Sequence, residues 1–400
     1  MPTNYKILGQ TAPLAAFETL NYTVPSLTST MVKSINITNR SATSDTFSIA
    51  LASQNLIASP IFLALQPTGA GGGTSAASST DGITWTTRTL PANVGTPIFS
   101  AFGNKKFVFT TDTASTLQST DGITWTSINP GRTLSGIVYA NSMFVAVSPN
   151  STTAVNSTDG ITWNTRTLPV NANWTPLRFG NNTFVALAST STTAASSTDG
   201  ITWTERTLPS SANWLSLAFG NGVFAATAFS STAVITSTDG IAWTTSTLPT
   251  TPSFGTPLTF GNGVFVVLYT NSTTAASSTD GITWTLRTLA TSSGWNRVTF
   301  GNGIFLSAAA FTTRAITSTD GITWTTRTLP TSSNWWTVSF GTPDIPLATT
   351  PANYIAFNST VPGNSTVTFK AGYTLPTNGD IRVISTNGTS TFSTFGAEIS

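Results

Sequence analysis

The sequence contains no cysteine and no histidine among its 400 residues. Their absence excludes disulfides, thiol nucleophiles, Cys/His zinc sites and every Ser-His or Cys-His mechanism. Charged residues are also scarce at 8%, and the net charge of +2 rests on 16 basic against 14 acidic groups. A nucleic-acid-binding protein needs a basic surface to meet phosphates, so this composition argues against nucleic acid as a partner.

Long apolar runs and a visible export signal are missing as well. No stretch of eighteen apolar residues occurs, so neither a membrane-spanning helix nor a membrane partner is expected. Residues 1–10, MPTNYKILGQ, lack the basic-then-apolar order of a signal peptide. A chain of this length exceeds the usual size of a single core, so we expect one large repeat domain plus a smaller module.

The sequence is instead rich in one seven-residue word, Ser-Thr-Asp-Gly-Ile-Thr-Trp at 197–203, which occurs in seven near copies about forty residues apart. Such a period with short β-like runs is typical of a circular or stacked repeat. The Asp residues of the word are Asp81, Asp121, Asp159, Asp199, Asp239, Asp280 and Asp320. The Trp residues are Trp85, Trp125, Trp163, Trp203, Trp243, Trp284 and Trp324.

Each copy of the word predicts a turn followed by a wedge. Asp-Gly between strand-like runs indicates a hairpin, since Gly accepts positive φ and the carboxylate can accept free backbone N–H groups. The Trp is expected on the outgoing strand, burying roughly 150 to 250 Å² between neighbouring units. The word resembles the Asp-box of sialidase-type β-propellers, with one residue fewer between Asp and Gly. In that family the box is structural, so the resemblance implies a propeller and no catalytic role for these Asp residues.

The repeat at 173–207 can be divided into four strands of one propeller blade. We expect strands at 174–179, 184–188, 193–197 and 201–207, with a tight turn at 180–182. Residues 61–66 and 74–90 would supply three strands of a further blade, and 335–340 would supply its missing inner strand. The ring of seven blades would therefore close by a 3+1 clasp, rather than remain open as a solenoid.

The two chain ends, 1–58 and 346–400, carry no copy of the word and read as short strands separated by turns. Each end supplies about four strands, too few to form a covered sheet alone. We therefore predict an all-β fold in which a seven-bladed β-propeller at 59–345 is inserted into a discontinuous β-sandwich formed by both ends.

Short words in the two ends resemble small virion proteins of tailed phages, especially those of cyanobacteria. They are YKILGQ at 5–10, YTVP at 22–25, INITN at 35–39, NYIA at 353–356 and FGAEI at 395–399. The resemblance implies a structural protein on the virion surface, a capsid decoration or tail fibre component whose sandwich docks on other virion proteins. Assembly in the host cytoplasm with release by lysis, and a homo-trimer by analogy with other virion sandwiches, are implied in the same way.

Residues suited to catalysis or metal binding are few. The acids in the repeat region that the turns do not explain are Asp112, Glu205 and Asp344, which form no repeated pair, so no catalytic residues are assigned and no enzyme is expected. One Asp per blade cannot supply the oxygen shell of calcium, so neither a metal nor a cofactor is expected. Five arginines, Arg88, Arg166, Arg206, Arg287 and Arg327, are expected on outer strands, where they would protect sheet edges.

A second aromatic series stands where the chain enters each inner strand, at Trp174, Trp214, Phe254, Trp295, Trp335 and Trp336. The favoured interpretation is packing between blades. The alternative hypothesis is a partial circle of rings that stacks on a host surface glycan. The leading function is therefore a non-enzymatic surface protein whose propeller projects outward, with a free lectin or adhesin and a sialidase-like glycan hydrolase as alternatives.

Overall fold

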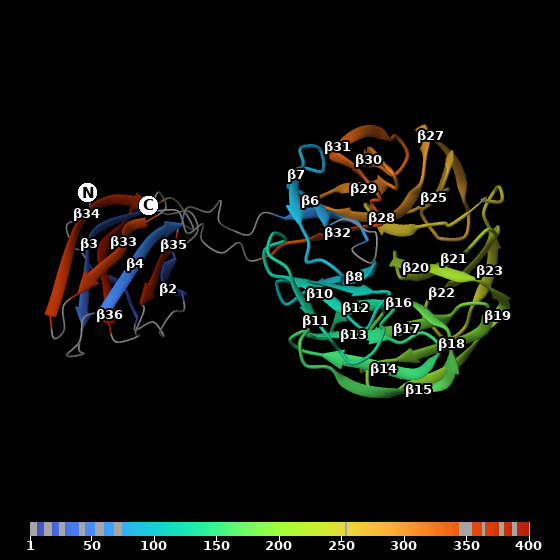
Figure 1. Cartoon of the computed structure of the whole chain (residues 1–400), viewed down its shortest axis with the longest axis horizontal. Coiled ribbons are helices and arrows are strands. Elements are labelled where there is room, and N and C mark those ends of the chain that lie inside the picture. The colour runs from blue at the N-terminus through green and yellow to red at the C-terminus, as the bar shows by residue number, and fades with distance from the viewer. Residues whose placement is uncertain are drawn as a thin grey trace. The chain divides into compact units, whose positions relative to one another are not determined.

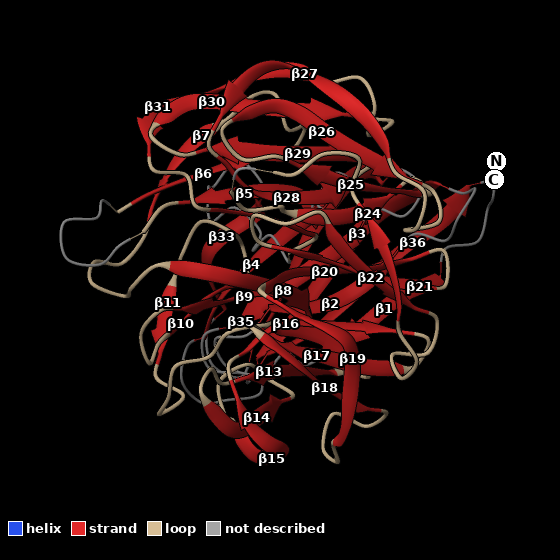
Figure 2. Ribbon diagram, turned by 90° about the vertical axis from the view of Figure 1, so that its right-hand side faces the viewer, coloured by secondary structure: helices blue, strands red, loops and turns tan. Residues whose placement is uncertain are grey.

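The computed structural model describes residues 60–67, 74–252 and 254–343 with their side chains, together with the backbone of eight strands nearer the chain ends. All regular structure in these residues is β-strand, and the described part of the chain holds no helix long and apolar enough to cross a membrane (Figure 2). The chain divides into two units, Met1–Ser59 with Ile345–Ser400, and Pro60–Asp344.

The first unit holds two antiparallel four-stranded sheets, and each sheet interleaves strands from both chain ends. One has the order β1-β36-β3-β34 and the other the order β2-β35-β4-β33. The N-terminal strands are β1 (Lys6–Thr11), β2 (Glu18–Thr23), β3 (Ser29–Asn39) and β4 (Asp45–Ala52). The C-terminal strands are β33 (Tyr354–Val361), β34 (Ser365–Leu375), β35 (Asp380–Ser385) and β36 (Ser390–Ile399). Neither end can therefore complete a sheet without the other.

The second unit is a seven-bladed β-propeller of antiparallel four-stranded sheets (Figure 1). Blade 1 consists of β8 (Pro97–Gly103), β9 (Lys106–Thr111), β10 (Thr116–Ser119) and β11 (Thr126–Ile128). Blade 2 consists of β12 (Ile137–Ala140), β13 (Met143–Val147), β14 (Ser151–Ser157) and β15 (Asn164–Ala172). Blade 3 consists of β16 (Trp174–Gly180), β17 (Thr183–Ala188), β18 (Ser191–Ser197) and β19 (Thr204–Ala212).

The remaining blades follow the same order from the inner to the outer strand. Blade 4 consists of β20 (Trp214–Gly220), β21 (Val223–Ala228), β22 (Ala233–Ser237) and β23 (Thr244–Thr247). Blade 5 consists of β24 (Leu258–Gly261), β25 (Val264–Leu268), β26 (Ser272–Ser278) and β27 (Thr285–Ser293). Blade 6 consists of β28 (Trp295–Gly301), β29 (Ile304–Ala309), β30 (Thr312–Ser318) and β31 (Thr325–Ser333).

Blade 7 joins the two ends of the insertion. Its inner strand β32 (Thr337–Gly341) pairs with β5 (Ile61–Leu65), followed by β6 (Ser75–Ser79) and β7 (Thr86–Thr89). Each innermost strand contacts the next around the circle, and β32 contacts β8. The predicted seven blades and the 3+1 clasp are confirmed, and the solenoid alternative is wrong.

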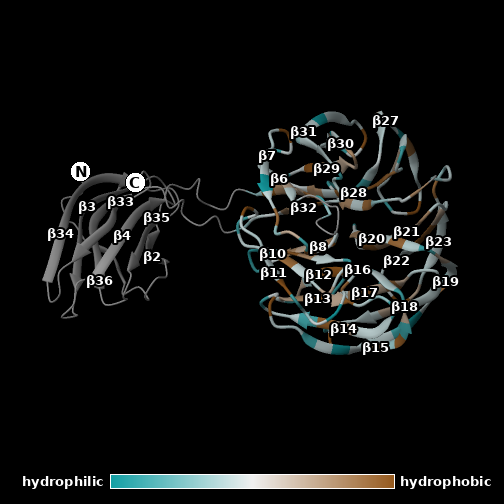
Figure 3. Ribbon diagram, in the orientation of Figure 1, coloured by the Kyte–Doolittle hydropathy of each residue, from teal (hydrophilic) through white to brown (hydrophobic). Residues whose placement is uncertain are grey.

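The outer strand of a blade begins later than the sequence indicated. In blade 3 it starts at Thr204 rather than at residue 201, because residues 198–203 form the Asp-Gly loop. Trp203 is therefore the last residue of the loop and not part of the strand. The strand then continues to Ala212, with a register irregularity between Ser191 and Thr193 of its partner. Outer strands are mostly exposed and coloured as hydrophilic, as in β15 (Figure 3).

Neighbouring blades are locked together where their inner strands end. An aromatic ring stands one residue before the last position of each inner strand, and six of the seven rings lie against the final Gly of the preceding blade; blade 2 ends in Ala140 instead. A Cβ added to Gly220 would overlap the ring of Phe260, and one added to Gly341 would overlap Phe102. The second contact joins blade 7 to blade 1. Close packing favours glycine at these six positions, because a Cβ there would overlap the ring of the next blade.

Asparagines in the first turn of five blades, Asn104, Asn141, Asn181, Asn221 and Asn262, add polar links between blades. Asn221 Nδ2 donates to the carbonyl oxygens of Gly263 at 3.0 Å and Thr279 at 2.9 Å, both in the next blade. Asn181 and Asn262 make the equivalent pairs of bonds. Asn221 has φ of +49°, a conformation that Asn tolerates better than most residues, so the residue serves the turn and the link together.

Candidate functional site

The seven Asp-Gly loops share one hydrogen-bond geometry. In every loop, Oδ1 of the Asp accepts the N–H groups two and three residues further along at 2.7–3.0 Å. The Ser two residues before donates its hydroxyl to the same oxygen at 2.8–3.0 Å. The Gly of each loop has φ between +68° and +75°. The predicted structural role of all seven Asp residues is confirmed.

These hydrogen bonds also explain how the loops titrate. The N–H groups of Thr162 and Ile161 lower the pKa of Asp159 to about 2, and the pKa of each of the other six loop carboxyls is lowered too. Hydrogen bonds to a carboxylate favour its charged form. Oδ1 of each loop Asp is thus bonded to its own backbone, as a structural turn requires.

The loop tryptophans act as the predicted wedges. Trp203 of blade 3 shares a buried cluster with Val145 of blade 2, and its ring centroid lies 6.5 Å from that of Phe184. Trp125 of blade 1 shares a cluster with Leu63 of blade 7 in the same way. The other five also pack against the preceding blade. This prediction is confirmed at all seven positions.

The hypothesis that the second aromatic series forms a sugar-stacking circle is wrong. Four of its six members have no solvent exposure (0%), namely Trp174, Trp214, Trp295 and Trp335. Each lies inside a core cluster between two blades, and Trp174 Nε1 donates to the carbonyl of Ser151 at 3.0 Å. A ring without exposed surface cannot stack on a ligand. Phe254 is 49% exposed and Trp336 is half-buried, so these two do not complete a circle.

The remaining predicted polar residues lie apart from one another. Asp112 of blade 1 accepts the N–H of Thr96 at 2.7 Å, and Glu205 is exposed on the outer strand β19 of blade 3. Asp344 lies outside the described residues. The five outer-strand arginines lie on β7, β15, β19, β27 and β31 as expected, and Arg206 Nε donates to Ser196 Oγ of its own blade at 2.8 Å.

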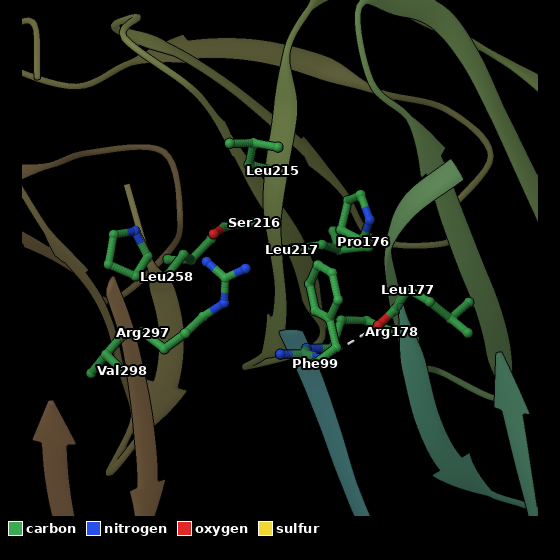
Figure 4. Close-up of a pocket in the computed structure, with 11 residues that line it drawn as sticks. Phe99, Pro176, Leu177, Arg178, Leu215, Ser216, Leu217, Leu258, Arg297 and Val298 are labelled. Atoms are coloured by element: carbon green, nitrogen blue, oxygen red, sulfur yellow. Dashed lines mark hydrogen bonds between the residues drawn. The ribbon is translucent and has the colours of Figure 1, made fainter. Parts of the chain in front are cut away.

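The innermost strands enclose a cavity on the axis of the ring, which we call the axial channel. It has two sections, of about 50 Å³ and about 280 Å³. Both are lined by Phe99, Arg178, Arg297 and Val298, which come from blades 1, 3 and 6. Figure 4 shows these four residues in the smaller section. The smaller section is otherwise mostly apolar, with Leu, Pro and one Ser, whereas Ser and Thr side chains line much of the larger section.

Arg178 and Arg297 are the only ionisable side chains that line the described channel. No carboxylate accepts a hydrogen bond from either one among the described residues. Arg178 Nη1 donates to the carbonyl of Leu177 at 3.3 Å, and Arg297 Nη1 to that of Asn296 at 3.2 Å. The guanidinium carbon of Arg297 lies 5.1 Å from the ring centroid of Phe99, and its Nε is buried without a partner.

Burial perturbs both guanidinium groups. Burial and the nearby charge of Arg178 lower the pKa of Arg297 to about 10, and burial also lowers the pKa of Arg178. Both directions show that the charged forms are poorly solvated where they stand. A guanidinium is protonated at neutral pH, so the channel carries two positive charges, and no acidic side chain is among its described lining residues.

The sequence analysis did not identify these two residues, although the repeats contain a signal for them. Arg297 stands four residues before the final Gly of its inner strand, where the other blades have Phe99, Gly136, Pro176, Ser216, Pro257 and Thr337. Arg178 stands two residues before that Gly, where the others have Ala101, Val138, Ala218, Thr259, Thr299 and Ser339. A basic residue found once at an otherwise uncharged position of a repeat indicates a function that the repeat itself does not need.

Comparison with known proteins identifies the fold. Residues 42–194 and 132–254 match the model of the DUF6242 β-propeller domain, and the two matches together span more than half of the chain. Virginiamycin B lyase from Staphylococcus aureus is similar at 13% identity, covering 81% of this chain and 99% of that chain with a TM-score of 0.55. A protein from Lactobacillus plantarum is similar at 14% identity, covering 70% and 99% with a TM-score of 0.54.

A third solved structure, YCF48 bound to D1 peptide, is similar at 14% identity, covering 64% of this chain and 94% of that chain with a TM-score of 0.51. The sequence matches no curated protein. At these identities the solved structures show a shared fold alone. The resemblance of the chain ends to tailed-phage virion proteins is wrong as an identification, because the matching family is a propeller domain and none of these similar structures is named as a virion protein.

Proposed function

Because the chain belongs to the DUF6242 β-propeller domain family, whose description names a fold and no activity, we propose its function from the axial channel. The protein is a non-enzymatic binding protein that holds an anionic ligand between Arg178 and Arg297. The observation that carries the proposal is a pair of poorly solvated guanidinium groups without a protein counter-charge. Unpaired charge of this kind is costly in a folded protein, so a ligand that neutralises it gains the corresponding free energy.

The chemistry of the channel favours binding over catalysis. A guanidinium donates hydrogen bonds in a planar fork that matches carboxylate and phosphate, but it does not exchange protons near neutral pH. With the pKa of Arg297 at about 10, neither arginine can serve as a general base there. Among similar folds one name describes a lyase and another a protein bound to a peptide, so the fold itself does not decide between enzyme and binding protein.

Thermal unfolding in the presence of simple anions tests the proposal. All twelve tryptophans lie between residues 85 and 336, so tryptophan fluorescence reports the propeller alone. We expect phosphate and acetate to raise the Tm above its value in chloride at equal ionic strength. The double variant Arg178→Met/Arg297→Met should lose this rise. The matched control Arg314→Ala removes one exposed positive charge from β30 and should keep it. An equal rise in the double variant contradicts the proposal.

The rival functions make different predictions. A glycan hydrolase built on Asp112 or Glu205 should lose turnover when either acid is replaced, although the two lie on different blades. A lectin that uses the exposed Phe254 and the half-buried Trp336 should bind a glycan array through these two rings. Its binding should not depend on Arg178 or Arg297. We do not propose a virion location, virion partners or a homo-trimer, because these expectations depended on the phage resemblance.

We also propose that the two sheets of the terminal unit pack face to face as a β-sandwich that attaches the propeller to a larger assembly. Both sheets interleave strands from 1–58 and 346–400, which ties the two segments into one unit. Amide hydrogen exchange tests the packing. In a sandwich, the central strands β3 and β4, which belong to different sheets, open together and show the same opening free energy. Clearly different values would show that the sheets open independently.

A further inference from the structure

The larger section of the axial channel carries an arc of hydroxyl groups beside the arginines. Thr259, Thr299 and Ser339 come from blades 5, 6 and 7, which are consecutive around the ring. Each stands two residues before the final Gly of its inner strand, the same position that Arg178 holds in blade 3. Equivalent register on equivalent strands places the three hydroxyl residues and Arg178 at one level of the channel.

The hydroxyl groups of this arc are not used by the fold. None of the three makes a side-chain hydrogen bond to another part of the described chain, in contrast to Thr227 and Thr256, which bond each other nearby at 3.1 Å. Buried polar groups in native proteins are normally satisfied, so hydroxyls that line a cavity without a protein partner indicate water or a ligand as the partner.

The other half of the same level is apolar or charged. Val138 of blade 2 lines the channel at this position, whereas Ala101 and Ala218 of blades 1 and 4 pack in core clusters. Phe99 lies beside the guanidinium of Arg297. A ligand in the channel therefore meets two guanidinium groups, of which that of Arg297 stands on the same strand as Thr299, together with the hydroxyl arc and an apolar surface. At about 280 Å³ the larger section lies just below the usual range for drug-sized ligands, which suits a small molecule.

We propose that the ligand of the axial channel is a small hydroxylated organic anion, of monosaccharide size, whose single carboxylate or phosphate pairs with Arg178 and Arg297 while its hydroxyl groups meet Thr259, Thr299 and Ser339. This inference rests on the proposed anion-binding function and specifies its ligand class. A planar guanidinium pair holds the charged group in a defined orientation, and the arc then selects for hydroxyl groups on the remainder of the molecule.

Isothermal titration of the full chain with five probes tests the inference. The probes are glucuronate, glucose 6-phosphate, acetate, inorganic phosphate and neutral glucose. We expect at least one hydroxylated anion to bind about tenfold or more tightly than its simple counterpart: glucuronate compared with acetate, or glucose 6-phosphate compared with inorganic phosphate. Two or three additional hydrogen bonds from the sugar hydroxyl groups would give a difference of this size. Whichever pair shows the preference identifies the charged group as carboxylate or phosphate. Glucose should bind far more weakly than either acid.

Removal of the hydroxyl groups gives the second arm of the experiment. The variant Thr259→Val/Thr299→Val/Ser339→Ala should lose the tenfold preference and still bind the simple anions as the unmodified chain does. The single variant Thr299→Val, with an expected two- to threefold loss, serves if the triple variant does not fold, and Thr326→Val on the exposed outer strand β31 is the matched control. Tryptophan fluorescence confirms that each variant is folded.

Two results overturn the inference and are distinguishable. If hydroxylated anions bind no more tightly than simple anions, while Arg178→Met/Arg297→Met abolishes binding, the ligand class is wrong and the anion-binding function stands. If no anion binds, or if binding survives the loss of both arginines, the inference and the proposed function fail together.

Discussion

The seven Asp-Gly loops and the axial channel are built from the same repeats, but the charged groups of the loops have hydrogen-bond partners that stabilise their charge, whereas those of the channel lack a counter-charge among the described lining residues. Each loop holds one carboxylate that is satisfied by two backbone N–H groups and a Ser hydroxyl. The channel holds two guanidinium groups without a counter-charge. The loops hardly vary from blade to blade, whereas Arg178 and Arg297 each occur once. Satisfied charge at a repeated position indicates a structural role, and unsatisfied charge at a unique position indicates a ligand.

Acid should have the largest effect on the stability of the propeller, because it protonates the carboxylates of all seven loops. The folded-state pKa of each loop Asp lies below its ordinary value, so the folded protein binds fewer protons than the unfolded chain. The stability that this provides is complete above about pH 4 to 5 and is lost as the pH falls toward 2. We expect the Tm from tryptophan fluorescence to fall steeply there. A Tm that is flat between pH 5 and pH 2 would contradict the interpretation.

Truncation of a buried inter-blade ring should have the next largest effect. Trp214→Ala removes a side chain without solvent exposure, at a cost of about 3–5 kcal/mol in the free energy of unfolding. The channel arginines are unchanged, so anion binding by the folded fraction should persist at low temperature. Chemical denaturation and titration calorimetry measure the two quantities. Lost binding with an unchanged free energy of unfolding would restore the aromatic series as a ligand site.

Replacement of a channel arginine should change stability in the opposite direction. Arg297→Met replaces a poorly solvated charge beside Arg178 by an apolar side chain of similar length, and we expect a gain of about 1–3 kcal/mol in the absence of anions. Anion binding should fall sharply in the same variant. Denaturation with and without phosphate separates the two effects. A destabilised variant would show that Arg297 is part of the structural framework, as the loop Asp residues are.

Removal of a single loop hydroxyl should have a moderate effect. Ser197→Ala deletes the hydroxyl that donates to Asp199 and accepts the N–H of Gly200 at 2.9 Å. A loss of about 1–2 kcal/mol is expected, because the buried N–H is left without a partner. Chemical denaturation measures this loss, and anion titration should give an unchanged affinity. An effect on affinity would mean that the loops and the channel are coupled.

The smallest effect is expected at the exposed member of the aromatic series. Phe254→Ala removes a ring that is 49% exposed and should change the free energy of unfolding by less than about 0.5 kcal/mol. Anion binding should also stay the same. Chemical denaturation and titration calorimetry measure both quantities, as for Trp214→Ala, so the two variants can be compared directly. A loss of several kcal/mol would show that burial does not distinguish these positions.

The loops could be predicted from the sequence because their chemistry is local. Asp199, Gly200 and Trp203 lie within five residues, so the hydrogen bonds to Asp199 and the positive φ of Gly200 follow from the word itself. The clasp of blade 7 was predictable for a related reason. One end of the insertion supplies three strands that lack an inner strand, and the other end supplies a single inner strand that lacks partners, so the two sets complete one blade. Repetition made both predictions reliable.

The aromatic series shows where sequence reasoning was insufficient. Trp214 and Phe254 occupy corresponding places in successive repeats, yet one is fully buried and the other half exposed. Trp214 begins the strand β20, whereas Phe254 precedes a blade whose inner strand begins only at Leu258. Whether a ring at this place is covered depends on the packing of the adjacent blade, which no local pattern encodes.

By itself the sequence determined the seven loops, the wedge tryptophans and the closed ring, because each follows from short-range turn chemistry repeated at a fixed interval. Only the tertiary structure decided which side chains meet on the axis. Arg178 and Arg297 stand three blades apart and at different positions of the repeat, so nothing along the chain marks them as neighbours. Closure of the ring brings the inner strands around one cavity, and that closure places two isolated arginines in one candidate site.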